Sequence, residues 1–591
     1  MRVHYPRTPH LPWSPGAAPD DVRTGDLGGL RGREVVVTEK LDGENTTLYA
    51  DGLHARSPDS AHHPSRAWVK GLQGRIGGEI PPGWRVCGEN VFARHSLAYE
   101  DLESWFYGFS VWDGDRCLGW DRTVRFLRRL GVPVPPVLWR GVFDERALRA
   151  LRPDTARQEG YVVRAVEGFG RAEFGERIAK WVRRGHVQTG THWMHAAVVE
   201  NGLGPKAALW TVRSGGTASV AALSAAVGVA PGDPPAAGAE VAEAVAGTGA
   251  EAAVADVSAR LDGLGRHGDA RLAGVLAVML RGSRRAWLAP RLAGPLGLPA
   301  ARRVADLTGL FAAVQRPYPD GDRRAGLVRL ALAADLGVLH AVAGALARDA
   351  EAREQVEWSA LHAEDAGLLG AAPLAPLRAG LREALAGVGA DAADRCWAEA
   401  REAYAAGRIT TAAEAVAASW RWRSGSFPRL VHLVGPSGSG KSTFARGLAG
   451  TDAYVSLDDL REARGSRADQ RANGDVLRTG LARLDAALAG GGTAVWDATS
   501  LNRHQRAAVH RVAERRDALV THVVTLVGED ELARRNRERT HPVPPDVLAA
   551  QLHRFTPPYP GEAHRTWYVG AHGAVADVSG ALAGAADGGE A

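Results

Sequence analysis

The sequence predicts a multidomain protein in which α+β and α/β parts flank a helical middle region. Its 591 residues suffice for about three or four domains. Residues 1–200 hold short β-branched and aromatic runs separated by Gly, Pro and Asp, which is typical of a mixed sheet. Residues 205–425 are rich in alanine and have a helical period. Residues 427–575 alternate apolar strands with helices, which indicates a parallel sheet.

Four strands are expected in the first part of the chain. Each is a run of β-branched or aromatic side chains, and such side chains pack well on a pleated surface. One of these strands would end near Glu89. The expected strands are Glu34–Thr38, Arg85–Asn90, Trp105–Trp112 and Gly160–Arg164.

The middle region is predicted to be helical and to carry no chemistry. Ala345–Leu361 is one expected helix, with its charged residues on one face. The stretch 229–249 is rich in Pro, Gly and Ala and is expected to be a loop or linker. The histidines and acidic residues of His267–Asp269 and His362–Asp365 are interpreted as ordinary helix and loop residues.

The last part of the chain is predicted to form a parallel sheet with covering helices. Its apolar runs are short and alternate with helical segments. Residues 576–591 are small and polar, so this tail is expected to be disordered. The expected strands are Leu430–Val434, Ala453–Ser456, Thr493–Trp496 and Leu519–Val527.

The composition of the chain disfavours several classes of protein. The charge of +5, from 72 basic and 67 acidic residues, permits a polyanionic partner without requiring one. None of the three cysteines (Cys87, Cys117, Cys396) stands in a Cys-x-x-Cys pair, which disfavours a disulfide framework or a zinc ribbon and favours a cytoplasmic location. The sequence has no apolar run of about 18 residues, so no membrane span is expected.

A glycine-rich loop follows the apolar strand that ends at Val434. The loop reads Gly435-Pro-Ser-Gly-Ser-Gly-Lys-Ser442, and Thr443–Arg446 begins a helix. Glycines allow backbone N–H groups to close around phosphate oxygens, and the helix dipole adds to this attraction. We therefore predict that ATP or another nucleoside triphosphate binds here with Mg²⁺ or Mn²⁺. The expected nucleotide contacts are Gly435, Ser437, Gly438, Ser439, Gly440, Lys441, Ser442 and Thr443.

Roles follow for individual residues of this loop and of the segments behind it. Lys441 would reach the β- and γ-phosphates, while Ser442 would hold the metal ion. Asp458 follows a strand and could take a proton from an acceptor hydroxyl, although a helix-capping role is the alternative. Asp497 ends another strand and could serve the metal ion or simply occupy a turn.

An arginine-rich segment follows these carboxylates. Arg535 and Arg539 are four residues apart, so on a helix they would share a face and could close over a triphosphate. The alternative is a helix face exposed to solvent. The order of the loop, Asp458-Asp-Leu-Arg461, Asp497 and this segment resembles the 5′-hydroxyl polynucleotide kinase family. That resemblance implies that Asp458 is the general base and that Arg461 contacts the substrate phosphate. It also implies that Arg535 and Arg539 bind the phosphates of ATP.

A second nucleotide signature lies near the N-terminus, in Glu39-Lys-Leu-Asp-Gly-Glu-Asn45. Lys40 could attack an α-phosphate if it lost its proton, and neighbouring cations and a metal ion would lower its pKa. Glu89 and Glu159 stand at the edges of expected strands, while Lys180 and Arg183 supply cations. The aromatic run Trp105–Trp112 could provide a ring on which adenine stacks.

The order of these residues resembles the covalent nucleotidyltransferase superfamily, whose fold is unrelated to the ATP-grasp fold. Glu39 and Asn45, flanking the lysine, are similar to the RNA-joining branch of the phage RNA ligase 2 type. The resemblance implies that Lys40 carries AMP. It also implies the other contacts: Arg56 with the nucleotide, Glu89 with the ribose, Phe109 (or Phe106) with adenine, Glu159 with the metal ion and Lys180 with the α-phosphate. Arg183 stands where the family often has a second lysine, so its role stays open.

Together the two resemblances imply an RNA repair enzyme that phosphorylates 5′-hydroxyl ends. It would then seal 5′-phosphate to 3′-hydroxyl ends through a lysyl-AMP intermediate. No β-rich segment follows the last lysine motif, which favours RNA over DNA as the partner, and the helical region could position that RNA. The chain has no Asp-x-Asp-x-Thr phosphatase motif, so another enzyme would heal 3′ ends. A DNA nick-repair ligase–kinase and a non-catalytic RNA-binding ATPase switch are the alternatives.

Overall fold

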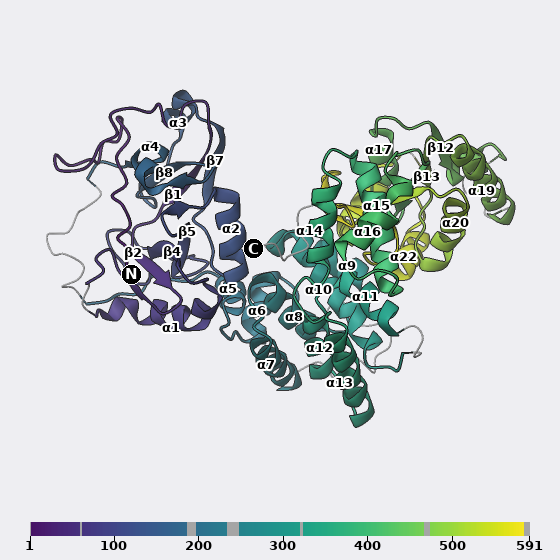
Figure 1. Cartoon of the computed structure of the whole chain (residues 1–591), viewed down its shortest axis with the longest axis horizontal. Helices are drawn as coiled ribbons and strands as arrows, with labels where there is room; N and C mark the ends of the chain where they lie inside the picture. The colour runs from purple at the N-terminus through teal and green to yellow at the C-terminus, as the bar shows by residue number, and fades with distance from the viewer. Residues whose placement is uncertain are drawn as a thin grey trace. The chain divides into compact units, whose positions relative to one another are not determined.

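The structure is a computed structural model that describes residues 2–59, 62–185, 197–232, 248–318, 323–465, 473–539 and 541–583. The chain divides into two compact units (Figure 1). Unit 1 comprises Met1–Val227 with Gly265–Leu272, and unit 2 comprises Gly228–Leu264 with Ala273–Ala591.

Unit 1 contains a four-stranded antiparallel sheet in the order β10-β8-β1-β7. Alternation along β1 sends Val35 and Val37 into the core, while Thr38 and Lys40 face the opposite way. Lys40 pairs with Gly160 across β8, so the neighbouring Glu159 comes close to it. The strands are β1 Glu34–Lys40, β7 Val137–Val142, β8 Gly160–Ala165 and β10 Ile178–Val182.

The second sheet of unit 1 has six strands in the order β3-β2-β4-β5-β6-β9. Asn45 on β2 lies opposite Glu89 on β4, so two residues 44 positions apart become neighbours. The helices α1 and α2 cover this sheet and share its apolar core. The strands are β2 Glu44–Tyr49, β3 Gly52–His54, β4 Trp84–Asn90, β5 Phe106–Asp113, β6 Arg116–Cys117 and β9 Phe169–Gly170. The helices are α1 Ala67–Ile76, α2 Trp120–Leu130, α3 Glu145–Ala150, α4 Phe174–Arg177, α5 Ala207–Arg213 and α6 Val220–Val227.

Helices occupy the middle of the chain, as expected. The described residues between β10 and β11 form no strand apart from isolated bridges at Glu200 and Leu203. Asp269 pairs with Arg128 and Arg213, which agrees with a structural role for this residue. The helices are α7 Thr248–Gly263, α8 Gly268–Met279, α9 Arg285–Leu296, α10 Leu298–Leu310, α11 Arg323–Ala333, α12 Leu336–Ala345, α13 Ala350–Asp365, α14 Ala375–Ala384, α15 Ala390–Ala405 and α16 Ala412–Ala418.

Unit 2 is built on a six-stranded sheet in the order β12-β13-β11-β14-β15-β16. All neighbouring strands are parallel except β16, which runs antiparallel to β15. The strands are β11 Arg429–Val434, β12 Ala453–Ser456, β13 Thr493–Asp497, β14 Leu519–Thr525, β15 Arg565–Val569 and β16 Val575–Ser579. The helices are α17 Lys441–Arg446, α18 Leu457–Glu462, α19 Asn473–Ala489, α20 Arg503–Arg515, α21 Glu529–Arg537 and α22 Pro545–Arg554. The predicted fold class is confirmed: a sheet-rich N-terminal part, a helical middle and a parallel α/β C-terminal part.

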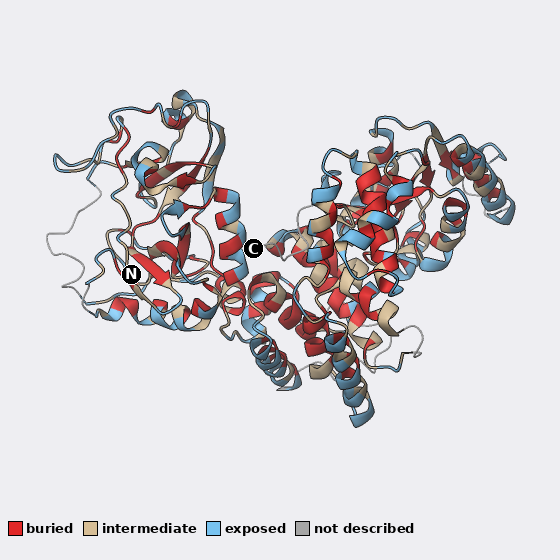
Figure 2. Ribbon diagram, viewed as in Figure 1, coloured by how far each residue is buried: buried red, intermediate tan, exposed pale blue. Residues whose placement is uncertain are grey.

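Apolar side chains cover both faces of this sheet. One core cluster gathers Leu430, Trp496 and Val509, and another gathers Leu433, Ala445 and Val523. Figure 2 shows the buried residues of unit 2 concentrated on the strands and on the helix faces toward them. A parallel sheet buried on both faces is the scaffold that the alternating sequence pattern predicts.

Ion pairs attach the middle helices to the edge of the same sheet. Arg302 on α10 donates to Asp577 on β16 at 2.7 Å, and both side chains are nearly inaccessible to solvent. Arg565 on β15 pairs with Asp391 and Asp394 on α15, at 2.8 Å in each case. Because charged groups are buried only when they are paired, these contacts tie the helices and the sheet into one compact unit.

Three sequence expectations need correction. The helix expected over residues 345–361 is two helices, because Asp349 accepts a hydrogen bond from the Ala352 N–H and so begins α13. Disorder was expected from residue 576, but β16 continues to Ser579; residues 584–591 lie outside the described part. The strand expected to reach Val527 ends at Thr525. Of the predicted loop at 229–249, residues 233–247 lie outside the described part.

Among the described residues, no single helix has the length and apolar character needed to cross a membrane. The helices α11 and α12 meet these criteria only as a pair, and they are bent by 97° relative to each other.

Candidate active sites

A pocket of about 970 Å³, counted with its open mouth, lies between the two sheets of unit 1. Strands β1, β8 and β10 form one wall, and strands β2, β4 and β5 form the other. Most of the predicted ligase residues therefore lie together, although they are spread over 142 positions of the sequence. The predicted residues that line it are Glu39, Lys40, Asn45, Arg56, Glu89, Phe109 and Lys180.

Lys40 is paired inside this pocket. Its Nζ donates a hydrogen bond to Glu159 at 2.5 Å, and the side chain of Glu159 is only 8% exposed. Burial lowers the pKa of Lys40, but the negative charges of Glu159 and Glu89 outweigh it, so the pKa lies above its ordinary value. The sequence prediction that neighbouring cations lower this pKa is wrong for the protein alone, because the nearest charges are carboxylates. Positive charge that neutralised these carboxylates would lower the Lys40 pKa.

Glu89 lies in the same cluster of charged side chains. Burial raises its pKa, Lys40 counteracts this, and the carboxylate of Glu159 adds to the rise, so that the pKa reaches about 8. The Gly43 backbone N–H also hydrogen bonds to Glu89. A carboxyl group with such a pKa ionises more easily when a cation enters, which makes this cluster suited to bind one.

The raised pKa of Glu89 predicts a dependence of stability on pH. Between pH of about 4.5 and 8 the folded protein holds a proton that the unfolded chain has lost, so stability falls as pH rises through this window. Glu89→Gln removes this ionisation. We expect the melting temperature of the variant to exceed that of the wild type by a margin that grows up to pH about 8 and then levels off. Scanning calorimetry at a series of pH values measures this margin. The exposed Glu100→Gln is the control, and an equal margin at all pH values for Glu89→Gln would contradict the assignment.

Several other polar side chains border the pocket. The Oδ1 of Asn45 is buried and has no hydrogen-bond partner among the described residues. Burial, reinforced by the positive charge of Lys40, lowers the pKa of Lys180. Glu39 lies at the rim and accepts a hydrogen bond from Gln158 at 3.1 Å. Arg56 lies in an exposed turn that also borders the pocket.

Aromatic and aliphatic side chains form one side of the pocket. Phe109 lines it and packs edge-on against Tyr5, with ring centroids 5.3 Å apart. The alternative residue, Phe106, lies in the core under α2, because residues three apart on a strand face opposite sides. Trp120 and Ile178 add further apolar surface. Together they line the pocket with apolar surface against which an aromatic base could stack.

Sequence reasoning missed Tyr5 and Trp120 in this pocket. Tyr5 belongs to the N-terminal segment, which carries no motif, and Trp120 is the first residue of α2. Arg183 was predicted to belong to this site, but it is not among the residues that line the pocket. It follows β10 by one residue, and its backbone N–H donates to the Glu159 carbonyl at 3.0 Å.

The glycine-rich loop of unit 2 connects β11 to α17. Gly438 and Gly440 have φ values of 82° and 90°, a region in which other residues are strained. Lys441 lies buried at the first position of α17, and its Nζ reaches the Pro436 carbonyl at 3.4 Å. Burial lowers the pKa of Lys441, while Asp497 and Asp458 act in the opposite direction. Gly435, Ser437, Ser439, Ser442 and Thr443 complete the predicted loop and the start of its helix.

Gly435 is predicted to be indispensable to this loop. A Cβ atom at this position would lie 2.1 Å from Oγ1 of Thr525 and 3.0 Å from Oγ of Ser439. Gly435→Ala should therefore displace the loop and reduce ATP binding by unit 2 by at least about 100-fold, a loss of more than about 2.7 kcal/mol. Binding of a fluorescent ATP analogue measures the effect. The control is Gly528→Ala, because a Cβ atom there meets nothing within 4 Å, and unchanged binding in Gly435→Ala would contradict the prediction.

The predicted catalytic side chains of unit 2 lie at the carboxyl ends of its strands. Asp458 is in the first turn of α18, its side chain is 65% exposed, and it accepts a hydrogen bond from Arg461 at 2.6 Å. Asp497 ends β13 and accepts a hydrogen bond from the hydroxyl of Tyr454 at 2.6 Å. In doubly wound sheets this edge is where ligands bind.

The two predicted phosphate-binding arginines also approach the loop. The guanidinium of Arg535 contacts the Ser439 carbonyl at 3.5 Å and pairs with Glu531 at 2.7 Å. The expectation that Arg535 and Arg539 share a helix face is wrong, because α21 ends at Arg537. Arg539 lies beyond that end, yet it is near enough to Lys441 to lower its pKa.

Gln551, which no sequence motif indicated, contacts the glycine-rich loop. Gln551 on α22 accepts a hydrogen bond from the Ser437 N–H at 2.9 Å. Backbone N–H groups of such a loop are the donors that phosphate oxygens use. The Gln551 amide therefore stands where a phosphate would otherwise accept this bond.

Comparisons with known proteins confirm both resemblances. Residues 33–182 match the family model described as RNA ligase, and residues 430–558 match the model described as an AAA domain. No curated protein matches the chain.

Solved structures resemble parts of the chain. One from the Pnkp1/Rnl/Hen1 RNA repair complex is 24% identical over 22% of this chain and 44% of its own, with a TM-score of 0.21. A Naegleria gruberi RNA ligase variant with ATP and Mn is 18% identical over 26% of this chain and 51% of its own, with a TM-score of 0.21. A sugar kinase from Janibacter sp. is 24% identical over 24% of this chain and 86% of its own, with a TM-score of 0.20. This chain thus covers about half the length of the RNA repair and RNA ligase chains.

Proposed function

We propose that this protein repairs RNA by phosphorylating 5′-hydroxyl ends and then sealing them to 3′-hydroxyl ends. The observation that carries the proposal is the position of Lys40, paired with Glu159 at 2.5 Å inside a pocket with an apolar wall. The match of residues 33–182 to the RNA ligase model supports the sealing half. The buried loop lysine of unit 2, with carboxylates at the adjoining strand ends, supports the phosphorylating half.

In unit 1, the amine of Lys40 attacks the α-phosphorus of ATP. The deprotonated amine forms a P–N bond and releases a proton to solvent, the bond from the α-phosphorus to the bridging oxygen breaks, and pyrophosphate leaves with the electron pair. Phe109 and Trp120 hold the adenine, and Lys180 faces the α-phosphate. The RNA 5′-phosphate then takes the AMP from Lys40, and a 3′-hydroxyl displaces AMP from the activated end.

A divalent cation fits the charge distribution of this pocket. Glu89 and Glu159 crowd two carboxyl groups around one amine, and the pKa of Glu89 is raised to about 8. Glu159 is the residue we expect to hold Mg²⁺ or Mn²⁺, with Ser442 and Asp497 as its counterparts in unit 2. Bound at these positions, the cation would neutralise phosphate charge and shift the Lys40 pKa downward.

In unit 2, Asp458 accepts the proton of the RNA 5′-hydroxyl as its oxygen attacks the γ-phosphorus. ADP is the leaving group, and Lys441, Arg535 and Arg539 stabilise the negative charge that passes to it. Arg461, which contacts Asp458 at 2.6 Å, orients this base and faces the substrate phosphate. The product of unit 2, an RNA 5′-phosphate, is the acceptor that unit 1 requires.

A labelling experiment tests the proposal. The full-length protein is incubated with ATP labelled at the α-phosphate, and a label that survives denaturation and maps to Lys40 is expected. Failure to label in a protein that still binds RNA would leave the non-catalytic ATPase switch as the better reading. With γ-labelled ATP, an RNA with a 5′-hydroxyl nick should gain phosphate and then lose its nick.

The choice between RNA and DNA requires a matched pair of substrates. The helices that follow β10, where a β-rich domain would otherwise be expected, support RNA. Nicked duplexes of one sequence, made wholly of RNA or wholly of DNA, are sealed side by side. Faster sealing of the DNA nick would replace RNA repair by DNA nick repair.

A further inference from the structure

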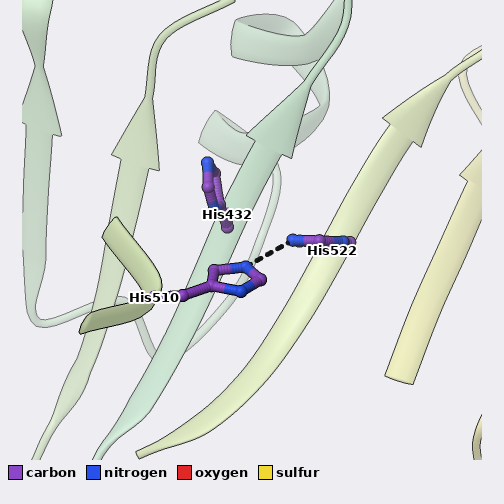
Figure 3. Close-up of side chains that lie close together, drawn as sticks. All are labelled: His432, His510 and His522. Atoms are coloured by element: carbon purple, nitrogen blue, oxygen red, sulfur yellow. Dashed lines mark hydrogen bonds between the residues drawn. The ribbon is translucent and has the colours of Figure 1, made fainter. Parts of the chain in front are cut away.

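Three histidines from distant parts of the chain meet inside unit 2. His432 lies on β11, His522 on the adjacent parallel strand β14 and His510 on helix α20. His432 and His522 are register partners, so their side chains leave the same face of the sheet. His510 reaches this face from the covering helix, and Figure 3 shows its ring meeting that of His522, with His432 beside the pair.

The rings are close enough to share one ligand. One nitrogen from each ring can be chosen so that all three lie within 4.8 Å of one another, and the Nε2 atoms of His510 and His522 are 2.8 Å apart. Tetrahedral zinc with Zn–N distances of about 2.0–2.1 Å needs nitrogens about 3.3 Å apart. The nitrogens, now separated by 2.8 Å in one pair and by no more than 4.8 Å in the others, would have to shift to reach this spacing.

The three rings are shielded from solvent. His432 and His522 are completely inaccessible to solvent, and His510 is half-buried. Neutral imidazole is the form that coordinates metal ions.

Hydrogen bonds within the protein satisfy only part of this cluster. The Nε2 atoms of His510 and His522 share a hydrogen bond at 2.8 Å. The Nε2 of His432 pairs with the Ser500 hydroxyl at 2.9 Å. The Nδ1 atoms of His432 and His522, however, have no partner among the described residues. Buried polar atoms without partners are costly, and in native proteins they often mark an unseen ligand. Three imidazoles packed at ring distances of 4.9–5.6 Å also replace what would otherwise be apolar core.

We propose that His432, His510 and His522 form a structural site for one divalent transition-metal ion, with zinc as the expected occupant. Three imidazole nitrogens suit zinc and its neighbours in the first transition row, whereas Mg²⁺ prefers oxygen ligands. The ion would fasten α20 to strands β11 and β14. Since β11 leads directly into the glycine-rich loop, the site would hold the strand that positions this loop. It is separate from the Mg²⁺ positions of the proposed function and does not depend on them.

The test uses the full-length protein, freed of metal by a chelator and of any affinity tag. Zinc is then titrated in competition with a chromophoric chelator, and metal content is measured by mass spectrometry. We expect one tightly bound zinc per chain and a melting temperature that rises by several degrees on loading. His510→Ala should weaken the affinity by at least about 100-fold, since loss of even an outer contact to a metal ligand costs 10- to 100-fold.

The matched control is His504→Ala, which removes an exposed histidine from the same helix and should bind zinc as the wild type does. A second variant, His510→Gln, keeps the side chain polar and should lose zinc equally while remaining folded by circular dichroism. The proposal is overturned if the wild type retains no zinc at micromolar concentration, or if both His510 variants bind it unchanged. Anomalous diffraction that places the zinc on other residues would also overturn it.

Discussion

Replacing Lys40 by alanine will abolish the covalent labelling of the protein by α-labelled ATP and with it all RNA sealing. The residual rate should be at least about 10⁴-fold below that of the wild type, because the proposed P–N bond forms on the Lys40 amine. Phosphorylation of 5′-hydroxyl ends should continue at the wild-type rate, since its residues belong to unit 2. Gel electrophoresis of labelled protein and labelled RNA measures both activities in one reaction.

Two further substitutions separate the chemistry of Lys40 from its charge. Lys40→Arg keeps a positive charge beside Glu159 but cannot attack phosphorus at neutral pH, so it should label no better than alanine. Lys70→Ala removes an exposed lysine of α1 and should label fully. If Lys40→Arg retained the label, another residue would be the nucleophile and the assignment of the pocket would fail.

Asp458→Asn will have the opposite effect on the two activities. Transfer of the γ-phosphate to a 5′-hydroxyl should slow by about 10²- to 10⁴-fold, because the amide cannot accept the proton of the attacking hydroxyl. Sealing of RNA that already carries a 5′-phosphate should be unchanged. Asparagine has the size of aspartate, and the Asp458 side chain is 65% exposed, so little change in stability is expected.

The neighbouring carboxylate provides the control. Asp459 is also exposed, and its backbone N–H donates to the Ser456 hydroxyl that caps α18. Asp459→Asn should phosphorylate RNA at nearly the wild-type rate. Equal losses in the two variants would show that the net charge of the turn, and not a base at position 458, supports the reaction. Loss of sealing in Asp458→Asn would contradict independent active sites.

Many elements of the fold could be predicted because their signals are local. Strand β12 lies at Ala453–Ser456 as expected, and β11 and β13 extend the expected runs by a single residue each. A run of β-branched residues favours a strand, and the glycines that follow it favour a turn, so both can be predicted from a short stretch of sequence. The break between α12 and α13 was missed because alanine-rich sequence continues the helical period through it. The cap at Asp349 is a weaker signal than that period.

Sites formed across the sheets were harder to predict. The order of residues along the chain allowed Lys40, Glu89 and Glu159 to be named. It did not allow the effect of the two carboxylates on the Lys40 pKa to be predicted. That effect depends on distances set by the pairing of β1 with β8 and on burial between two sheets. Gln551 reaches the glycine-rich loop from a helix more than 100 residues away and had no sequence signal.

The sequence by itself indicated the residues proposed to carry the chemistry, because the candidate nucleophile, the glycine-rich loop and the candidate metal-binding carboxylates are specified by residue type and by spacing of a few positions. Only the tertiary structure decided whether positive or negative charge dominates around Lys40. It also decided which aromatic rings line the pocket of unit 1 and which histidines lie close together. These properties depend on distance and burial, and both arise from packing between segments that the chain keeps far apart.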